Sequence, residues 1–359
     1  MEGCMDFSTF KKVLNIPHIK PYIESAELTA MNEYLRSGGY LTEYHHTKYL
    51  ESIIEKFLTV KHVSMVPNGT SALYLSLLAS EIGPGDEVLV PDYTMIAVPN
   101  AVRMVGAKPK LIDVEEDTHC MDIKKARVTK KTKAMIYVDI NGRSGNMSKV
   151  RGFCRKHKLI LIEDACQSLG SKHKGEYLGR SGRFNCFSLG FHKIVTTGQG
   201  GFIAMRSKGD YDKIERLKDF GRIKGGNDKH DYLGFNFKFT DLQAVIGIEQ
   251  MKTIKWRMDR KREIYKQYHE GEAPEGYVPW FIEYEVKGRD TLYTKLTRKG
   301  IGCRKLYPPV HTQKIYTGGK FPISDKISRR GIWLPSSLDL KEDEINQIKD
   351  IVHAYTQGH

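Results

Sequence analysis

The stretch best suited to chemistry holds a single lysine between an apolar segment and a glycine-rich turn. Ser188 ends the apolar segment, Lys193 follows five residues later, and the glycines at 198, 200 and 201 come next. A partly desolvated lysine amine can attack a carbonyl and form a Schiff base, and glycines let the backbone pass close to a bound molecule. The alternative is a turn before a strand, with Lys193 as a surface cation. This stretch alone supports both interpretations equally.

A second stretch, residues 162–167, places carboxylates at the end of another apolar segment. Open parallel sheets bind ligands at the carboxyl ends of their strands. Asp164 could therefore keep the ring nitrogen of pyridoxal phosphate (PLP) protonated, and Gln167 could contact its ring hydroxyl. A magnesium-binding acidic pair of a phosphate-transfer enzyme is the competing interpretation, and a simple capped strand end is the third.

Two further stretches carry groups that bind phosphate. Gly69, Thr70 and Ser71 begin a helix after an apolar strand, where free N–H groups and the helix dipole favour an anion. The same residue types also form an ordinary helix cap. Asn236 and Lys238 lie among phenylalanines before a long helix, where an aromatic contact at the helix start is an equally good explanation.

The elements that must position these residues follow an α/β pattern. Short apolar segments alternate with helical ones from about residue 60 to 205, which predicts a mostly parallel sheet between helix layers. Seven strands are expected, over residues 63–67, 86–92, 108–114, 133–140, 159–165, 184–190 and 200–205.

A long helix is expected from Thr240 and Asp241 to about residue 268. An α+β pattern follows it, with strands expected over residues 281–286 and near residues 302–307. The expected division is a large cofactor-binding domain over 1–255 and a small α+β domain over 256–359. We expect the N-terminal helix to pack with the small domain.

The composition limits the possible partners. The 359 residues carry a formal net charge of +14, but no nucleic-acid-binding motif accompanies it, so no nucleic-acid partner is expected. The basic run within residues 252–266 is expected to form a solvated helix face, with a phosphate-binding stripe as the alternative. No apolar run reaches the roughly 20 residues that span a bilayer, and no secretory signal is present. A cytoplasmic protein without a membrane partner is expected.

The cysteines provide no metal site. The six are scattered without a C-x-x-C pair, which fits neither a zinc site nor a disulfide framework. We expect reduced, mostly buried thiols and no bound metal.

In their order, these motifs resemble the DegT/DnrJ/EryC1/StrS family of PLP-dependent sugar aminotransferases, which have the aspartate-aminotransferase fold (fold type I). The resemblance combines N-G-T-S-A-L, G-P-G-D-E-V, E-D-A-x-Q, S-x-x-x-x-K-x-x-x-T-G-x-G-G and G-x-N-x-K, and it spans nearly the whole chain. Asp164 and Lys193 lie 29 positions apart (193 − 164), close to the separation usual in the family. Within the family, K-T-K-A and G-I-x-L-P-S are most similar to perosamine and viosamine synthases.

The resemblance implies roles for individual residues. Lys193 would form the Schiff base, Asp164 would hold the pyridinium nitrogen, and Gln167 would lie near the ring hydroxyl. The further cofactor contacts that it implies are Gly69, Thr70, Ser71, Met95, Ser188 and Asn236. Asn236 would reach the phosphate from the other subunit of a homodimer with shared sites. The expected contacts to the nucleotide sugar are Tyr40, Lys238 and His311.

The implied reaction moves an amino group from glutamate to C4 of a nucleoside-diphosphate 4-keto-6-deoxyhexose. The alternatives are a C3-keto-sugar aminotransferase, a PLP-dependent sugar dehydratase and a non-enzymatic regulator. In the dehydratases a histidine replaces the lysine. The distance of five residues from Ser188 places Lys193, and not His192, at that position and disfavours dehydration. The departures from the family pattern are Met95, Asp139, Gln199 and Lys238.

Overall fold

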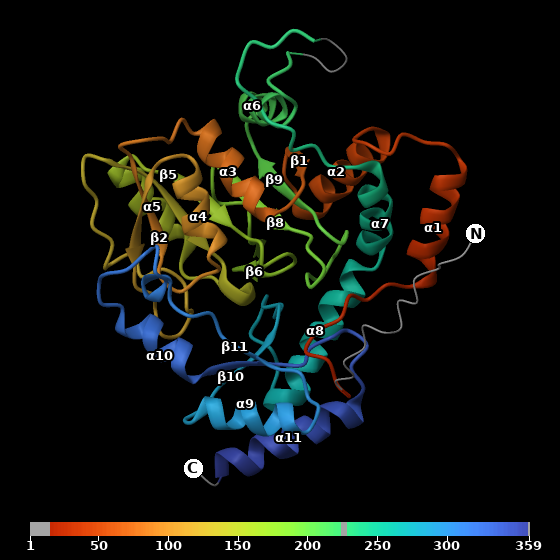
Figure 1. Cartoon of the computed structure of the whole chain (residues 1–359), viewed down its shortest axis with the longest axis vertical. Helices are drawn as coiled ribbons and strands as arrows, with labels where there is room; N and C mark the ends of the chain where they lie inside the picture. The colour runs from red at the N-terminus through yellow and green to blue at the C-terminus, as the bar shows by residue number, and fades with distance from the viewer. Residues whose placement is uncertain (1–14, 224–227, 358–359) are drawn as a thin grey trace.

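The computed structural model describes residues 15–223 and 228–357. A seven-stranded sheet occupies the upper body of the molecule in Figure 1, and a three-stranded sheet lies below it. This is the α/β architecture that the sequence predicts. Cys4 and part of the expected polar loop at 225–232 lie outside the described residues. The other five cysteines are free thiols.

The seven-stranded sheet contains all seven expected strands. These are β1 (His62–Val66), β2 (Glu87–Pro91), β3 (Lys108–Ile112), β4 (Thr132–Val138), β5 (Ile160–Asp164), β8 (Phe184–Ser188) and β9 (Gly201–Met205). Their order is β1-β9-β8-β5-β4-β2-β3, and only β9 runs antiparallel to its neighbours. Because β5 and β8 are adjacent and parallel, Asp164 and Ser188 end neighbouring strands at the same edge of the sheet.

Eleven helices surround the two sheets in the described residues. They are α1 (Ser25–Arg36), α2 (His45–Leu58), α3 (Gly69–Ala79), α4 (Ala97–Met104), α5 (Met147–His157), α6 (Lys208–Lys218), α7 (Asp241–Lys252), α8 (Ile254–His269), α9 (Arg289–Arg298), α10 (Pro322–Arg330) and α11 (Glu342–Gln357). None of these helices is long and apolar enough to cross a membrane.

The helix expected over residues 240–268 is interrupted. Thr240 caps α7 as expected, since its hydroxyl accepts the N–H of Gln243 at 3.2 Å. At Thr253 the backbone leaves helical geometry (φ −103°, ψ 9°), and α8 begins at the next residue. The Thr253 hydroxyl donates to the carbonyl of Gln250 at 3.2 Å, a back-bond of the kind that bends helices.

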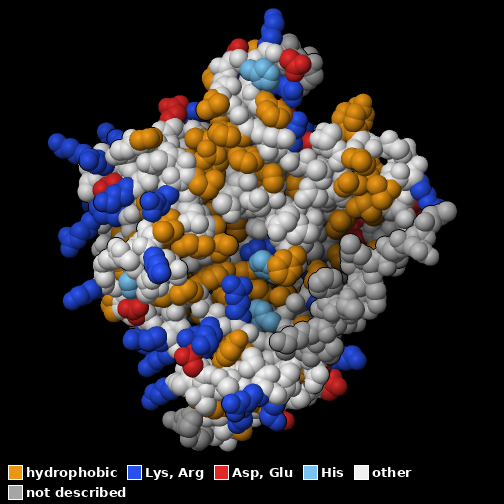
Figure 2. All heavy atoms as spheres, viewed as in Figure 1, with side chains coloured by type: hydrophobic (Ala, Val, Ile, Leu, Met, Phe, Trp, Pro, Cys, Tyr) orange, Lys and Arg blue, Asp and Glu red, His pale blue; other side chains and the backbone are white. Residues whose placement is uncertain are grey.

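The basic run over residues 252–266 is a solvated face only in part: Lys252, Lys255 and Lys266 are exposed as expected, but two other members are buried. Arg257 and Lys261 are 1% and 3% exposed, because α8 runs down toward the three-stranded sheet (Figure 1). Arg257 pairs with Glu27 at 3.3 Å. Lys261 donates to the carbonyls of Trp280, at 2.9 Å, and Ser336. Elsewhere, Lys and Arg side chains project along one margin of the face shown in Figure 2.

The three-stranded sheet is formed by β10 (Ile282–Glu285), β12 (Gly331–Leu334) and β11 (Arg304–Lys305), in that order and antiparallel. The sequence predicts β10 and β11 but not the short, fully buried β12.

The N-terminal segment packs in two places. Ile16 forms a bridge with Ile301 beside the three-stranded sheet, whereas α1 packs against α7. The segment before α1 thus contacts the C-terminal part, and α1 itself reaches α8 through the pair of Glu27 with Arg257. The division at residue 255 stays a prediction.

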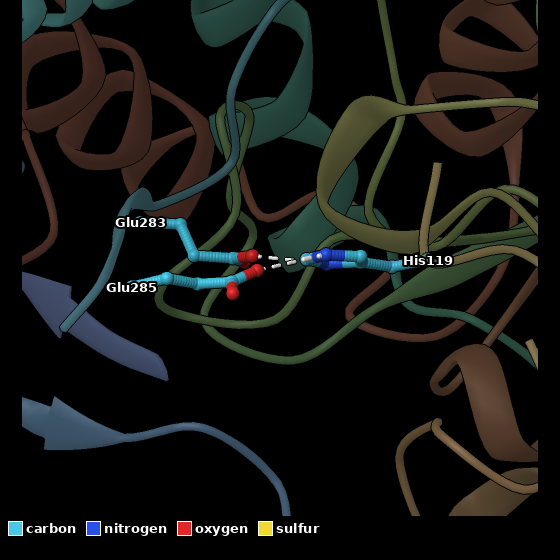
Figure 3. A group of neighbouring side chains, drawn as sticks. All are labelled: His119, Glu283 and Glu285. Carbon is cyan, nitrogen blue, oxygen red and sulfur yellow. Dashed lines mark ion pairs between the residues drawn. The ribbon is translucent and has the colours of Figure 1, made fainter. Parts of the chain in front are cut away.

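An ion-pair cluster joins the two sheets (Figure 3). Glu283 and Glu285 of β10 point at His119, whose Nδ1 and Nε2 lie 3.1 and 3.2 Å from the two carboxylates. Arg143 lies 3.1 Å from Glu283 and 3.3 Å from His119 Nδ1. Burial opposes a charge on His119, but hydrogen bonds to Glu283 and Glu285 raise its pKa above the usual value. One histidine and two carboxylates could hold a metal ion, but Arg143 already supplies a positive charge to Glu283.

The raised pKa of His119 predicts a pH-dependent contribution to stability. Its pKa is higher in the folded than in the unfolded chain. Its ion pairs should therefore stabilise the fold fully below the unfolded value, roughly 6.5, and lose this effect as pH rises through the folded value. We expect His119→Asn to lower the free energy of unfolding by about 2 kcal/mol at acidic pH and by less at alkaline pH. Chemical denaturation across pH tests this, and a pH-independent difference would contradict it. Glu285→Gln, at the more exposed carboxylate, should cost less than Glu283→Gln.

Candidate active site

Asp164, at the carboxyl end of β5, is a buried carboxylate. The strand lies in the middle of the sheet, and Asp164 is only 5% exposed. Its Oδ1 accepts the backbone N–H of Cys166 at 3.0 Å. Burial raises the pKa of Asp164, while the Cys166 hydrogen bonds and the charge of Lys193 counteract this rise. Within the described chain, Cys166 alone donates to the carboxylate, which can therefore accept a further proton donor.

Lys193 lies in the turn after β8, close to this carboxylate. Its backbone N–H donates to Gly190 at 2.9 Å, and its Nζ lies 3.7 Å from the ring centroid of Trp280. Burial lowers the pKa of Lys193 to about 8, against the opposing effects of Cys166 and Asp164. A substantial fraction of the amine is therefore neutral, and able to act as a nucleophile, near neutral pH.

The start of α3 completes the same region. Asn68 caps the helix by accepting the N–H of Ser71 at 2.8 Å. The stretch Gly69 to Ser71, predicted to bind phosphate, is thus also the first turn of a capped helix. A Cβ atom on Gly69 would lie 2.6 Å from the sulfur of Cys166 and 3.2 Å from the Cβ of Ser188. Gly69 is therefore the contact point at which α3, the end of β5 and the end of β8 meet.

Thr70 and Ser71 follow Gly69 in the first turn of α3. At this position their backbone N–H groups lie at the positive end of the helix dipole. Ser188 accepts the N–H of Gly190 at 3.3 Å, so its hydroxyl hydrogen can serve another acceptor. These groups form a site of the kind that binds a phosphate.

Gln167 is nearly buried, and its Oε1 accepts the backbone N–H of Asn141 at 2.8 Å. Asp139, two residues before Asn141, is completely buried. Neither of its carboxylate oxygens has a hydrogen-bond partner in the described residues. Burial, together with Glu163, raises the pKa of Asp139 well above its usual range. Asp139, one of the departures from the family pattern, therefore lies in the interior of the chain.

Two other predicted residues, Met95 and His311, make contacts of their own. Met95 is 42% exposed, and its sulfur accepts the N–H of Ala97 at 3.1 Å. His311 binds Asp92, just beyond β2, through its backbone N–H at 2.9 Å and its Nδ1 at 2.8 Å. No contact in the described chain brings Met95 or His311 to Lys193.

Asn236 and Lys238 precede α7 and contact Asp219 just after α6, whereas Tyr40 lies between α1 and α2 with its ring 4.7 Å from that of Tyr44. Lys238 pairs with Asp219 at 3.0 Å, and Asn236 forms a bridge with the same residue. Lys238 also lines a groove of about 800 Å³ beside residues 42–44. Tyr40 is 65% exposed. All three residues could therefore contact another molecule.

The sequence did not reveal that the aromatic side chains of Trp280 and Phe281 lie on one side of Lys193. We call these two side chains the aromatic wall. Trp280 donates from Nε1 to the carbonyl of His192 at 2.8 Å, and its ring lies 4.0 Å from that of Phe281. Burial raises the pKa of Tyr307, and the charge of Asp164 adds to this effect, so Tyr307 lies near the site. Figure 2 shows histidine and basic side chains among hydrophobic ones at the middle of this face. Aromatics after α8 were visible in the sequence, but no spacing linked them to Lys193.

Taken together, the residues fit the predicted cofactor. A buried carboxylate, a partly neutral lysine and a glycine-lined helix start lie at one sheet edge. These groups match a protonated ring nitrogen, an aldehyde and a phosphate, respectively.

Comparison with known proteins gives a consistent result. The profile of the DegT/DnrJ/EryC1/StrS aminotransferase family matches residues 21–353. The chain is similar to the GDP-perosamine synthase of Vibrio cholerae, at 32% identity over 95% of this chain and 99% of the relative. It is also similar to a UDP-N-acetyl-3-dehydro-alpha-D-glucosamine 3-aminotransferase of Acidithiobacillus ferrooxidans, at 31% identity over 92% and 94%.

Solved structures agree with the fold. A DegT DnrJ EryC1 StrS aminotransferase from Brucella abortus superimposes with a TM-score of 0.86 at 26% identity, covering 93% of this chain and 96% of the other. A Streptococcus pneumoniae protein solved in its PMP form gives a TM-score of 0.89 at 25% identity, covering 96% and 98%.

The pKa of Lys193 predicts how cofactor capture depends on pH. Only the neutral amine attacks an aldehyde. The rate at which cofactor-free protein takes up PLP should therefore fall about tenfold per pH unit below the pKa of about 8 and level off above it. Stopped-flow absorbance measures this rate. Lys193→Ala should abolish the visible Schiff-base absorbance. A rate that keeps rising well above pH 8, as for an exposed lysine, would contradict the prediction.

The close packing at Gly69 predicts a second effect. In Gly69→Ala the new methyl group meets Cys166 and Ser188, so the start of α3 must shift. We expect PLP to bind at least about tenfold more weakly, a loss of about 1.4 kcal/mol. Gly152→Ala on α5 is the matched control, because a Cβ there meets nothing within 4 Å. Adding Cys166→Ala to Gly69→Ala should recover part of the affinity. Equal affinities of the two glycine variants, measured by fluorescence titration, would contradict this packing.

Proposed function

The chain belongs to the DegT/DnrJ/EryC1/StrS aminotransferase family and is a PLP-dependent nucleotide-sugar aminotransferase, and we propose that glutamate is its amino donor and C4 of a nucleoside-diphosphate 4-keto-6-deoxyhexose its acceptor. The observation that carries the amine chemistry is that Asp164 and Lys193 are buried and close enough for their charges to interact, with the pKa of Lys193 lowered to about 8 by burial. Similarity to GDP-perosamine synthases supports the choice of acceptor.

In this proposal each side chain has one task. PLP, when bound, supplies an aldehyde and a ring that accepts electrons. Lys193 would hold PLP through its aldehyde and, once an incoming amine has displaced it, its free amine would take a proton from the amino donor's carbon and deliver it to the cofactor carbon. Asp164 keeps the ring nitrogen protonated, which its burial and free acceptor capacity support. Gly69, Thr70, Ser71 and Ser188 bind the phosphate.

The nucleotide sugar would meet a different set of groups. We propose that Tyr40, Lys238 and His311 contact it, with the cation of Lys238 facing the diphosphate. Tyr40 and Asn236 are exposed on the surface of this chain, Lys238 is partly exposed, and none of the three has a contact with Lys193 in the described residues. This position supports a homodimer in which Asn236 and its neighbours reach the partner's site.

One alternative within the family has support of its own. Similarity to a 3-aminotransferase is nearly as high as to the perosamine synthases, so amination at C3 is the second candidate. Lys193, and not a histidine, follows Ser188 at the five-residue distance, which argues against a dehydratase.

A substrate panel tests the proposal. Purified protein with PLP and glutamate would be mixed with GDP-, UDP- and dTDP-linked 4-keto-6-deoxysugars and with a UDP-linked 3-keto sugar. We expect mass spectrometry to detect an amino product from at least one 4-keto sugar, and none with Lys193→Ala. Amination of the 3-keto sugar alone would replace C4 by C3. An absence of any amino product would refute the substrate assignment.

A further inference from the structure

We propose that Asn141 is a positioning residue that orients the Gln167 carboxamide at the cofactor and ties it to residues 280–281. This inference rests on the proposed function, because it takes the ring oxygen of PLP as the ligand of Gln167. It adds a residue that contacts neither the cofactor nor the substrate directly.

Asn141 has an unusual conformation for a buried residue. It follows β4, is completely buried, and adopts left-handed backbone angles (φ 52°, ψ 31°). Side chains other than glycine rarely adopt this region, and asparagine tolerates it better than most. A strained backbone position persists only where its surroundings hold it in place.

The main chain of Asn141 faces the cofactor region. Its N–H donates to Oε1 of Gln167 at 2.8 Å. A carboxamide has one acceptor oxygen and one donor amino group. The bond to Asn141 therefore holds Oε1 of Gln167 toward Asn141 and leaves Nε2 on the other side of the carboxamide. The described residues make no hydrogen bond to its amino group. Nε2 is therefore the group available to donate to an electron-rich ring oxygen.

The side chain of Asn141 faces the C-terminal part of the chain. Its Oδ1 accepts the N–H of Phe281 at 2.8 Å, and its Nδ2 donates to the carbonyl of Phe281 at 3.0 Å. The carboxamide thus satisfies both peptide groups of a buried residue, as a neighbouring strand would. Unpaired, these buried groups would destabilise this arrangement. Aspartate could not reproduce the pairing, because it lacks the donor.

Residues 280–281 also contact the turn that carries Lys193. Trp280 donates to the carbonyl of His192, and its ring lies 3.7 Å from Lys193 Nζ. Lys261 donates to the carbonyl of Trp280 from the other side. Asn141 therefore joins the carboxamide of Gln167 and the wall beside Lys193 in one hydrogen-bonded unit.

The test uses Asn141→Gly, because glycine accepts the left-handed backbone and removes the side-chain pairing with Phe281, together with the longer Nδ2 contacts to Glu283 and Tyr277. The readout is the pH midpoint of the visible absorbance of the PLP-loaded protein, measured without any sugar. We expect the midpoint to move up by about one pH unit, since a ring oxygen that loses its donor becomes more basic. Gln167→Glu, whose carboxylate cannot donate, should shift the midpoint in the same direction. The ionisable neighbours of Asn141, Glu283 and Tyr277, at 3.3 and 3.4 Å, stay unchanged.

Ser171→Ala is the matched structural control. The Ser171 hydroxyl accepts the N–H of Val278 at 3.1 Å and donates to its carbonyl at 3.2 Å. The substitution thus removes a similar pairing three residues before Phe281 without a contact to Gln167. We expect it to lower the melting temperature and leave the midpoint at the wild-type value. Asn141→Ser, which loses the paired carboxamide and adds no charge, replaces Asn141→Gly if the latter does not fold.

The outcomes separate the two claims. Wild-type protein that gains no visible absorbance with PLP would refute both the proposed function and this inference. If wild type loads normally and Gln167→Glu shifts the midpoint, an unchanged midpoint in the Asn141 variants refutes the positioning role alone. An unchanged midpoint in Gln167→Glu refutes it too, because Gln167 would then have no donor role to orient. A shift in the Asn141 and Gln167 variants that is absent in Ser171→Ala supports the proposal.

Discussion

Asp164 and Lys193 bring opposite charges together at a sheet edge from which most water is excluded. Burial raises the pKa of the carboxylate and lowers that of the amine, while each charge favours the ionised form of the other. Charges in such surroundings persist only when nearby polar groups compensate for lost hydration. Cys166 supplies one donor to Asp164, and the Trp280 ring faces the Lys193 amine. The remaining capacity of both groups is available to a ligand.

The topology of the sheet makes this pairing possible. Parallel strands end at one edge, so β5 and β8 deliver Asp164 and Ser188 side by side. Gly69 must lack a side chain for the start of α3 to reach them. A second set of elements then closes the site from below. β10 is attached to the large sheet through the pairs that His119 and Arg143 make with Glu283, which places the aromatic wall against the turn that carries Lys193.

Much of this could be predicted from the sequence, because it depends on local patterns. Apolar runs followed by Asp164 and Ser188 identify the strand ends, and the Gly-Thr-Ser stretch identifies a helix start. What could not be predicted depends on packing between distant segments. Nothing in the spacing connects Trp280 with Lys193 or Asn141 with Phe281. The burial of Arg257 and Lys261 was missed because a basic run resembles a solvated face until the helix is placed between two sheets. Thr253 interrupts an otherwise continuous helical pattern through its own conformation.

The antiparallel direction of β9 has a consequence for the order in which this site assembles. The Lys193 turn connects β8 to β9, neighbours in both sequence and space, and such local contacts cost little chain entropy to form. Asp164 reaches its place only through parallel pairing between β4, β5 and β8, which closes longer loops. During refolding, the turn that carries Lys193 should therefore form before Asp164 reaches its place. Stable retention of the cofactor then requires a finished fold, so cofactor binding would report that the parallel part of the sheet has assembled.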